Sequence, residues 1–157
     1  MRLIIVLLVA AVGAGAYAVG ASSQTTGGQA SRAALAQAVN PVGAKGRTLG
    51  LSRVTIPPHV QLGLHHHAGT QIAYIQRGTL TYTVRTGAVK VYRGAADQHP
   101  RVVRTVTAGH SGKVVTGEWV IEQPQVIHFG ANNGSTPVVI LLATLFTNGS
   151  PPSIPVS

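Results

Sequence analysis

Residues 65–71 read His-His-His-Ala-Gly-Thr-Gln, and Gly78 follows after six further residues. Far downstream in this 157-residue chain lies another histidine, His128. Side chains two positions apart on a β-strand point to the same face, so His65 and His67 would share one face. A third imidazole from a distant strand can complete a metal-binding cluster. The pattern therefore predicts a β-rich protein built around a histidine site.

Short β-rich runs, broken by Gly, Pro, Asn and Asp, follow one another from Thr48 onward. Branched and aromatic residues favour strands, and the breaking residues mark turns. Many short strands with regularly spaced turn signals predict an all-β antiparallel sandwich or barrel. We expect strands at residues 49–56, 60–67, 71–76, 79–85, 89–92, 102–107, 113–116, 118–122, 126–129 and 138–146.

The chain divides into four predicted segments. Residues 1–21 begin Met-Arg and continue as an uncharged apolar run, which is typical of a secretory signal peptide; an uncleaved membrane anchor is the alternative. Residues 22–47 are expected to form a flexible linker, with one short helical segment at 32–39. We expect the β-barrel at 48–147 and a tail at 148–157. The protein would then be secreted or extracytoplasmic, and membrane-attached only if the segment is uncleaved.

The composition is strongly basic and contains no cysteine. Lys and Arg number 12 against 3 Asp and Glu, which gives a formal net charge of +9. Such a surface attracts anions. The basic residues are scattered, without a basic helix face or an aromatic stacking platform, so nucleic acid is not an expected partner. Because the chain contains no cysteine, disulfides and thiolate metal sites are excluded. The partner that we expect is a small-molecule ligand.

Strand parity brings the candidate metal ligands together. In the strand expected at residues 60–67, the even positions are apolar, whereas the odd positions include His65 and His67. A tight turn after this strand would return Gln71 beside the two imidazoles. If His128 arrives from a later strand, a site with four ligands closes inside the barrel.

These residues resemble the two sequence motifs of the cupins. The first cupin motif is a His-x-His pair, three or four residues, a Glu, six residues and a Gly, and residues 65–78 match it with Gln71 in place of the Glu. The second motif runs from a Gly through a Pro to a His and an Asn, and it is matched by Gly117, Pro124, His128 and Asn132. The resemblance covers about residues 48–146.

The resemblance implies a jelly-roll barrel, the double-stranded β-helix, with a metal ion held by three His and one carboxylate. Carried over residue by residue, the ligands are His65, His67, Gln71 and His128. An amide in place of a carboxylate leaves the full 2+ charge of the ion on the site, which lowers affinity and favours an anionic ligand. Imidazole-rich sites suit divalent transition metals, and the sequence does not choose among Zn, Mn, Fe, Cu and Ni.

The pocket wall is predicted from aromatic and acidic residues of the later strands: Tyr74, Tyr82, Trp119, Glu122 and Phe129. Glu122 is also the candidate for proton transfer, because it precedes the strand of His128. Two functions remain open. One is a metal-dependent enzyme of the dioxygenase or isomerase type acting on a small anionic substrate. The other is a non-catalytic module that binds a small ligand or a metal.

Three further expectations concern features outside the predicted ligand set. The apolar run at residues 138–146 would be buried on both faces, which favours sheet-to-sheet pairing as a homodimer. The histidine triplet could instead lie in a surface loop, or the barrel could keep its shape without a metal. The other histidines are expected to be exposed or structural: His59, His66, His99 and His110.

Overall fold

The computed structural model describes residues 28–157, so the predicted signal peptide lies outside the described residues. Within this range no helix has the length and apolarity needed to cross a membrane. The described chain is built from twelve strands: β1 (Ser31–Val39), β2 (Arg47–Ile56), β3 (His65–His66), β4 (Gly69–Arg77), β5 (Thr79–Thr86), β6 (Ala88–Arg93), β7 (Arg101–Thr107), β8 (Ser111–Val115), β9 (Glu118–Glu122), β10 (Ile127–Ala131), β11 (Val138–Thr147) and β12 (Ile154–Pro155).

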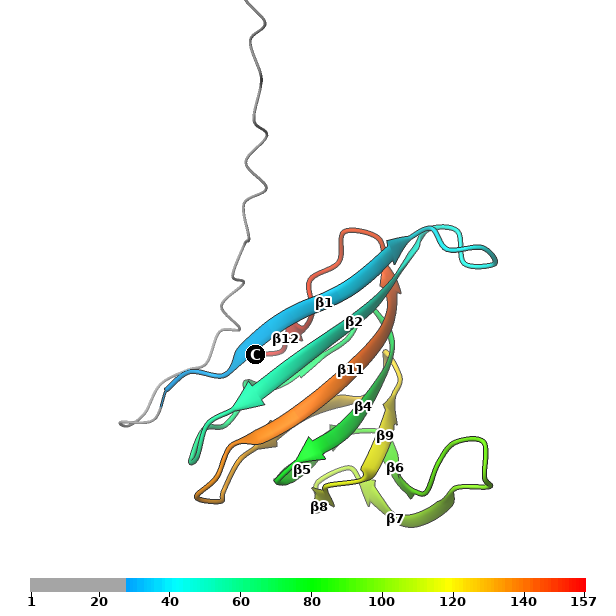
Figure 1. The fold of residues 1–157 in the computed structure, drawn as a ribbon. Helices are drawn as coiled ribbons and strands as arrows, with labels where there is room; N and C mark the ends of the chain where they lie inside the picture. The colour runs from blue at the N-terminus through cyan, green and yellow to red at the C-terminus, as the bar shows by residue number, and fades with distance from the viewer. Residues whose placement is uncertain (1–27) are drawn as a thin grey trace, which may run out of the picture.

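The strands form two antiparallel sheets that enclose a common core (Figure 1). The order is β1-β2-β11-β4-β9-β6-β7 in the larger sheet and β12-β3-β10-β5-β8 in the smaller. Many neighbours come from distant parts of the chain, since β11 lies between β2 and β4, and β10 lies between β3 and β5. The all-β jelly-roll class predicted from the sequence is therefore confirmed.

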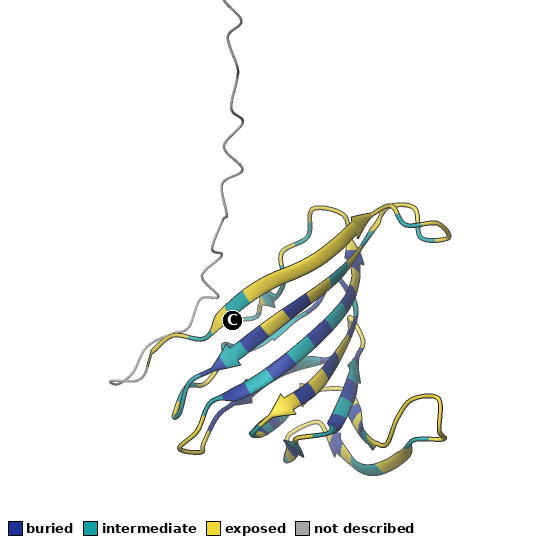
Figure 2. Ribbon diagram, viewed as in Figure 1, coloured by how far each residue is buried: buried dark blue, intermediate teal, exposed yellow. Residues whose placement is uncertain are grey.

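Buried side chains alternate with more exposed ones along β2, β11, β4 and β9 of the larger sheet (Figure 2). In β4, Ala73 and Ile75 are buried, whereas Ile72 and Tyr74 are each 41% exposed on the opposite face. The inward side chains of both sheets form one continuous cluster rich in valine, isoleucine and leucine. Full burial of each such side chain contributes about 1.5 to 3 kcal/mol. This core stabilises a chain that has no disulfide.

Two glycines are required where the first cupin-like motif turns back on itself. A Cβ at Gly69 would collide with the backbone of Leu145 in the neighbouring β11. Gly78, between β4 and β5, has a φ of 85°, which side-chain-bearing residues rarely adopt, and a Cβ there would press on Pro137 and Val138. These positions let β4 start against β11 and turn directly into β5.

The structure corrects the prediction of a linker and short helix before the barrel. Residues 31–39 form β1, which pairs antiparallel with β2 at the edge of the larger sheet. The segment is rich in alanine, so its local propensity does not favour a strand, and the backbone hydrogen bonds to β2 decide its conformation. Likewise the predicted tail contains β12, which pairs with β3.

Two further strand predictions need correction. Of the strand expected at residues 60–67, only His65–His66 is regular, because the preceding segment follows β10 through an isolated bridge between Gln61 and Ala131 and through irregular contacts. The run at 138–146 is not buried on both faces, since buried residues alternate with partly exposed ones. Its outward side chains adjoin an exposed apolar surface that includes Leu49, Leu51, Ile72, Tyr74 and Leu145.

We predict that Gly69→Ala lowers the free energy of unfolding by about 2 kcal/mol, because the added methyl group has to displace the backbone of β11. Urea denaturation measures this change. The control is Gly28→Ala, where the Cβ would meet only Pro57, at 3.8 Å. Equal stabilities of the two variants would contradict the close approach of β4 and β11.

Candidate metal centre

Three histidines converge between the two sheets. His65 and His128 are paired across β3 and β10, and His67 follows β3 directly. Their ring centroids lie 4.5 Å apart for His65 and His128, 5.0 Å for His65 and His67, and 5.2 Å for His67 and His128. One ring nitrogen from each lies within 4.8 Å of the others, and His67 and His128 are both only 3% exposed. The structure thus brings together the three histidines that the sequence pattern selected.

Backbone carbonyls orient all three imidazoles. The Nδ1 atom of His65 lies 2.7 Å from the Gly63 oxygen. For His67 the acceptor is the Pro152 oxygen at 3.0 Å, and for His128 it is the Val126 oxygen at 3.4 Å. Because a carbonyl oxygen only accepts, each Nδ1 carries the proton and each Nε2 is left for the common centre. This is the arrangement in which histidines bind metals in proteins.

Glu122 lies among these histidines. Its Oε1 is 3.3 Å from Nε2 of His128, and its Oε2 is 3.3 Å from Nε2 of His67. The carboxylate is 3% exposed and comes from β9, where Glu122 is the cross-strand partner of Gln71 in β4. The sequence predicted Glu122 for the pocket wall and for proton transfer. The structure places its carboxylate against two of the three candidate ligands, His67 and His128.

Gln71 reaches the cluster with its amide nitrogen. Nε2 of Gln71 donates to Oε2 of Glu122 at 2.5 Å and lies 3.2 Å from Nε2 of His67. Its Oε1 atom has no hydrogen-bond partner within the described chain. In this orientation the amide oxygen, which is the atom able to bind a metal, faces away from the histidines. Gln71 is therefore adjacent to the predicted ligand set, with its nitrogen turned toward it.

Burial and neighbouring charge set the protonation of the cluster. Burial, helped by the nearby His128, lowers the pKa of His65 to about 4. Burial alone would raise the pKa of Glu122, but the facing His128 and His67 hold it well below its ordinary value. Burial alone would lower the pKa of His128, and the Glu122 carboxylate outweighs it and raises this pKa. The cluster thus combines the buried, negatively charged carboxylate of Glu122 with an imidazole, that of His128, whose pKa is raised.

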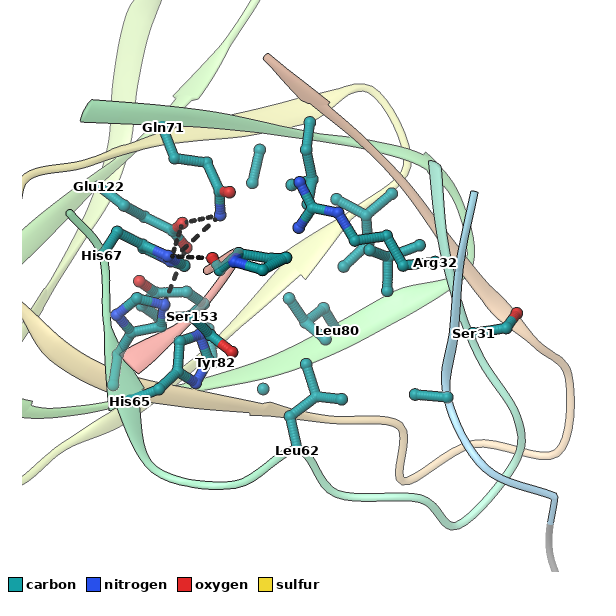
Figure 3. A pocket seen from close by; sticks show the side chains of 18 residues that line it. Ser31, Arg32, Leu62, His65, His67, Gln71, Leu80, Tyr82, Glu122 and Ser153 are labelled. Carbon is teal, nitrogen blue, oxygen red and sulfur yellow. Dashed lines mark hydrogen bonds and ion pairs between the residues drawn. The ribbon is translucent and has the colours of Figure 1, made fainter. Parts of the chain in front are cut away.

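A cavity of about 70 Å³ adjoins the cluster (Figure 3). Its wall is mostly apolar and is formed by Leu62, Leu80, Ile140 and Leu142, among others. Tyr82 also lines it, is 1% exposed and stacks on His128 with ring centroids 5.0 Å apart. Burial first and the nearby Glu122 second raise the pKa of Tyr82 well above its ordinary value. The hydroxyl therefore stays protonated, and within residues 28–157 it has no hydrogen-bond partner.

No protein-family model and no curated protein matches the chain. Solved structures do: a cupin-like protein from Thermotoga maritima matches with 17% identity over 83% of this chain and 77% of that chain, at a TM-score of 0.51. A cupin 2 conserved barrel domain protein from Rhodopseudomonas palustris matches with 16% identity over 87% of this chain and 75% of that chain, at a TM-score of 0.53. The chain has the cupin fold.

A cupin superfamily protein from Desulfitobacterium hafniense also matches, with 13% identity over 85% of this chain and 99% of that chain, at a TM-score of 0.50. At these identities the likeness establishes the fold alone.

Within this cupin barrel, Asn132 of the second motif has a structural role. It is 1% exposed, donates to the Ile56 and Thr136 oxygens, and accepts from the Gly134 nitrogen.

The structure places three of the residues predicted for the pocket wall away from this cavity. Tyr74, Trp119 and Phe129 do not line the cavity, whereas Tyr82 and Glu122 do. Each of the three lies an odd number of residues from an inward side chain on its own strand, so it points outward. Trp119 instead stacks on Tyr92, with ring centroids 4.4 Å apart. Strand parity in β9 alone would have separated Trp119 from Glu122.

We predict that Tyr82→Phe leaves the free energy of unfolding unchanged or raises it by up to about 1 kcal/mol, because the hydroxyl has no partner in the described chain. By contrast, Asn132→Ala should lower it by about 2 kcal/mol, since two carbonyls lose their donor. Thermal and urea denaturation of the two variants make the comparison. Equal destabilisation would contradict an unpartnered hydroxyl.

Proposed function

We propose that this cupin barrel holds one divalent transition metal ion with His65, His67 and His128, and with Glu122 as the carboxylate ligand. The protein would use this centre for a metal-dependent reaction on a small molecule bound in the adjoining cavity. The observation that supports the proposal most directly is the convergence of three imidazoles, two of them buried and one partly buried, each oriented by a backbone carbonyl on its Nδ1 atom.

The position of Glu122 can compensate for the carboxylate that is missing from the first cupin motif. Gln71 occupies the motif position, and its cross-strand partner Glu122 supplies the negative charge one strand away. A carboxylate together with three neutral imidazoles suits a divalent ion better than an amide does, because it offsets one unit of the ion's charge. We infer that Gln71 positions Glu122 by donating to it and does not itself bind the metal.

The surrounding residues define the chemistry that the site could support. A bound ion would polarise a ligand oxygen, and a redox-active ion would add oxidation chemistry. Tyr82 presents a protonated hydroxyl in the same cavity and can donate a hydrogen bond to a ligand. The apolar wall excludes most water, which strengthens each polar interaction made there. These features favour an enzyme of the kind the sequence suggested.

The second candidate function is a non-catalytic binding module. It is favoured by the closed network of Gln71, Glu122, His67 and His128, which satisfies the carboxylate without a metal ion. Such a barrel would retain a small ligand without converting it. If the metal-loaded protein converts a bound small molecule, it is an enzyme. If it retains the small molecule tightly without converting it, it is a binding module.

Two further proposals stem from the sequence. The signal-like residues 1–21 support export to an extracytoplasmic location. The exposed apolar face that contains Leu51, Ile72 and Leu145 supports pairing of two copies through the larger sheet. Both proposals are independent of the metal centre.

Metal content tests the proposed function. Protein purified without a histidine tag and loaded with Zn, Mn, Fe, Cu or Ni should hold about one ion per chain, as measured by mass spectrometry of the metal. The double variant H67A/H128A should lose it, because two of the three imidazole ligands are gone. Circular dichroism establishes that the variant is folded.

The matched control is H66A/H110A, which removes two imidazoles outside the cluster, one of them from the histidine triplet. Metal retained by H67A/H128A and lost from H66A/H110A would show adventitious binding at the surface. No metal in the unaltered protein after loading would contradict the proposal and leave the binding module.

The role of Glu122 gives a separate prediction. Glu122→Gln should weaken zinc binding by about tenfold or more, since an anionic ligand is replaced by an amide. Adding Gln71→Glu to this variant should restore most of the affinity, because the charge returns at the cross-strand position. Competition with a chelator measures both. Asp97→Asn, the same charge change in an exposed loop, is the control, and zinc affinity unchanged by Glu122→Gln would exclude Glu122 as a ligand.

A further inference from the structure

Arg32 is the one residue of β1 that is partly buried, whereas the other residues of the strand are exposed. It pairs with Val54 of β2 and contributes to the cavity wall, which it enters from the side opposite Gln71 and Glu122 (Figure 3). The remaining residues of this edge strand are alanine, leucine, serine, glutamine and valine, and all are exposed. A strand that turns its only charged side chain toward an apolar cavity has an unusual arrangement, because charged side chains normally face water.

No carboxylate of the chain neutralises this guanidinium. The whole sequence has three acidic residues. Glu118 is held by Arg93 at 2.7 Å and Arg104 at 2.6 Å, and Glu122 faces the histidines. The third, Asp97, is exposed in the loop between β6 and β7. Arg32 therefore forms no ion pair within the described residues.

A partly buried cation without an ion-pair partner in the described chain raises the free energy of the folded protein. Burial lowers the pKa of Arg32, yet a guanidinium remains protonated in proteins. Arg32 therefore keeps its positive charge, and the unfavourable free energy of burying that charge remains. An anion that binds beside it would relieve the cost and could accept two parallel hydrogen bonds. The cavity thus has a binding group for an anion at the end away from the histidines.

Two other polar groups in the cavity also lack partners. The Oε1 atom of Gln71, which is 4% exposed, and the hydroxyl of Tyr82, which is 1% exposed, make no hydrogen bond within residues 28–157. Buried polar atoms are nearly always hydrogen-bonded, so two such atoms in one cavity point to a ligand. The Gln71 oxygen accepts, and the Tyr82 hydroxyl can donate. Together with Arg32 they line a cavity whose wall is otherwise mainly apolar.

We propose that this cavity binds a short-chain carboxylate that carries a hydroxyl group, with the carboxylate on Arg32 and the hydroxyl between Gln71 and Tyr82. The inference rests on the proposed function, because the hydroxyl end of the ligand lies beside the proposed metal ion. The apolar carbons of the ligand pack against Leu62 and Leu80.

The size and polarity of the cavity select this class of anion. About 70 Å³ accommodates only a few non-hydrogen atoms. One guanidinium balances the single charge of a carboxylate, whereas a phosphate dianion would bring a second charge into an apolar wall. The neutral amide of the same acid would leave Arg32 unpaired. The expected order of affinity is therefore carboxylate first, with phosphate and amide weaker.

Isothermal titration calorimetry on the zinc-loaded full chain tests the proposal with a panel of short-chain carboxylates headed by lactate. Lactate should bind about tenfold or more tightly than lactamide. Arg32→Gln should weaken lactate binding by about tenfold or more and leave lactamide binding unchanged. The matched control is Arg53→Gln, which removes an exposed guanidinium from β2 and should change neither affinity. Thermal denaturation establishes that both variants are folded.

Four results would overturn the proposal: no binding by any carboxylate of the panel, equal binding of lactate and lactamide, lactate binding unaffected by Arg32→Gln, or tighter binding of inorganic phosphate. The same titrations on metal-free protein separate this proposal from the metal centre. Binding of lactate that depends on Arg32 in a protein that takes up no metal would support the carboxylate site and refute the proposed function. Metal uptake without carboxylate binding would support the proposed function and refute the carboxylate site.

Discussion

The contact of Glu122 with His67 and His128 is the interaction around which the barrel interior is arranged. A buried carboxylate is stable only with charged or hydrogen-bonding partners, and here two imidazoles and the amide of Gln71 supply them. Backbone carbonyls in turn fix the imidazoles. One of these carbonyls belongs to Pro152, so the segment after β11 contributes to the site. The centre thus depends on pairings that join both sheets and the end of the chain.

Local pattern predicted most of the strands and the three histidines, because alternation and the spacing of turn residues are visible in the sequence. It could not predict β1, whose alanine-rich sequence becomes a strand only through hydrogen bonds to β2. Nor could it place Glu122 beside the histidines, since this depends on the pairing of β4 with β9, segments about 50 residues apart in the sequence. The outward positions of Tyr74, Trp119 and Phe129 follow from parity once the strands are fixed.

The polar groups of the interior are divided between two ends of one cavity. At one end lie the histidines and Glu122, the proposed site for a cation, and at the other lies Arg32, the proposed site for an anion. The chain has few carboxylates, and two of its three are buried and paired, so none is left for Arg32. Arg32 is supplied by the edge strand β1. The segment predicted as a linker is therefore part of the proposed binding site.

In the proposed centre, three histidines and Glu122, rather than Gln71, hold the metal ion. Anomalous diffraction from a crystal of the zinc-loaded protein tests it most directly, because the signal locates the ion without reference to any variant. We expect a single ion about 2.0 to 2.2 Å from Nε2 of His65, His67 and His128 and from an oxygen of Glu122. An ion bound through His66, or through the amide oxygen of Gln71 with Glu122 outside the ligand set, would contradict this arrangement.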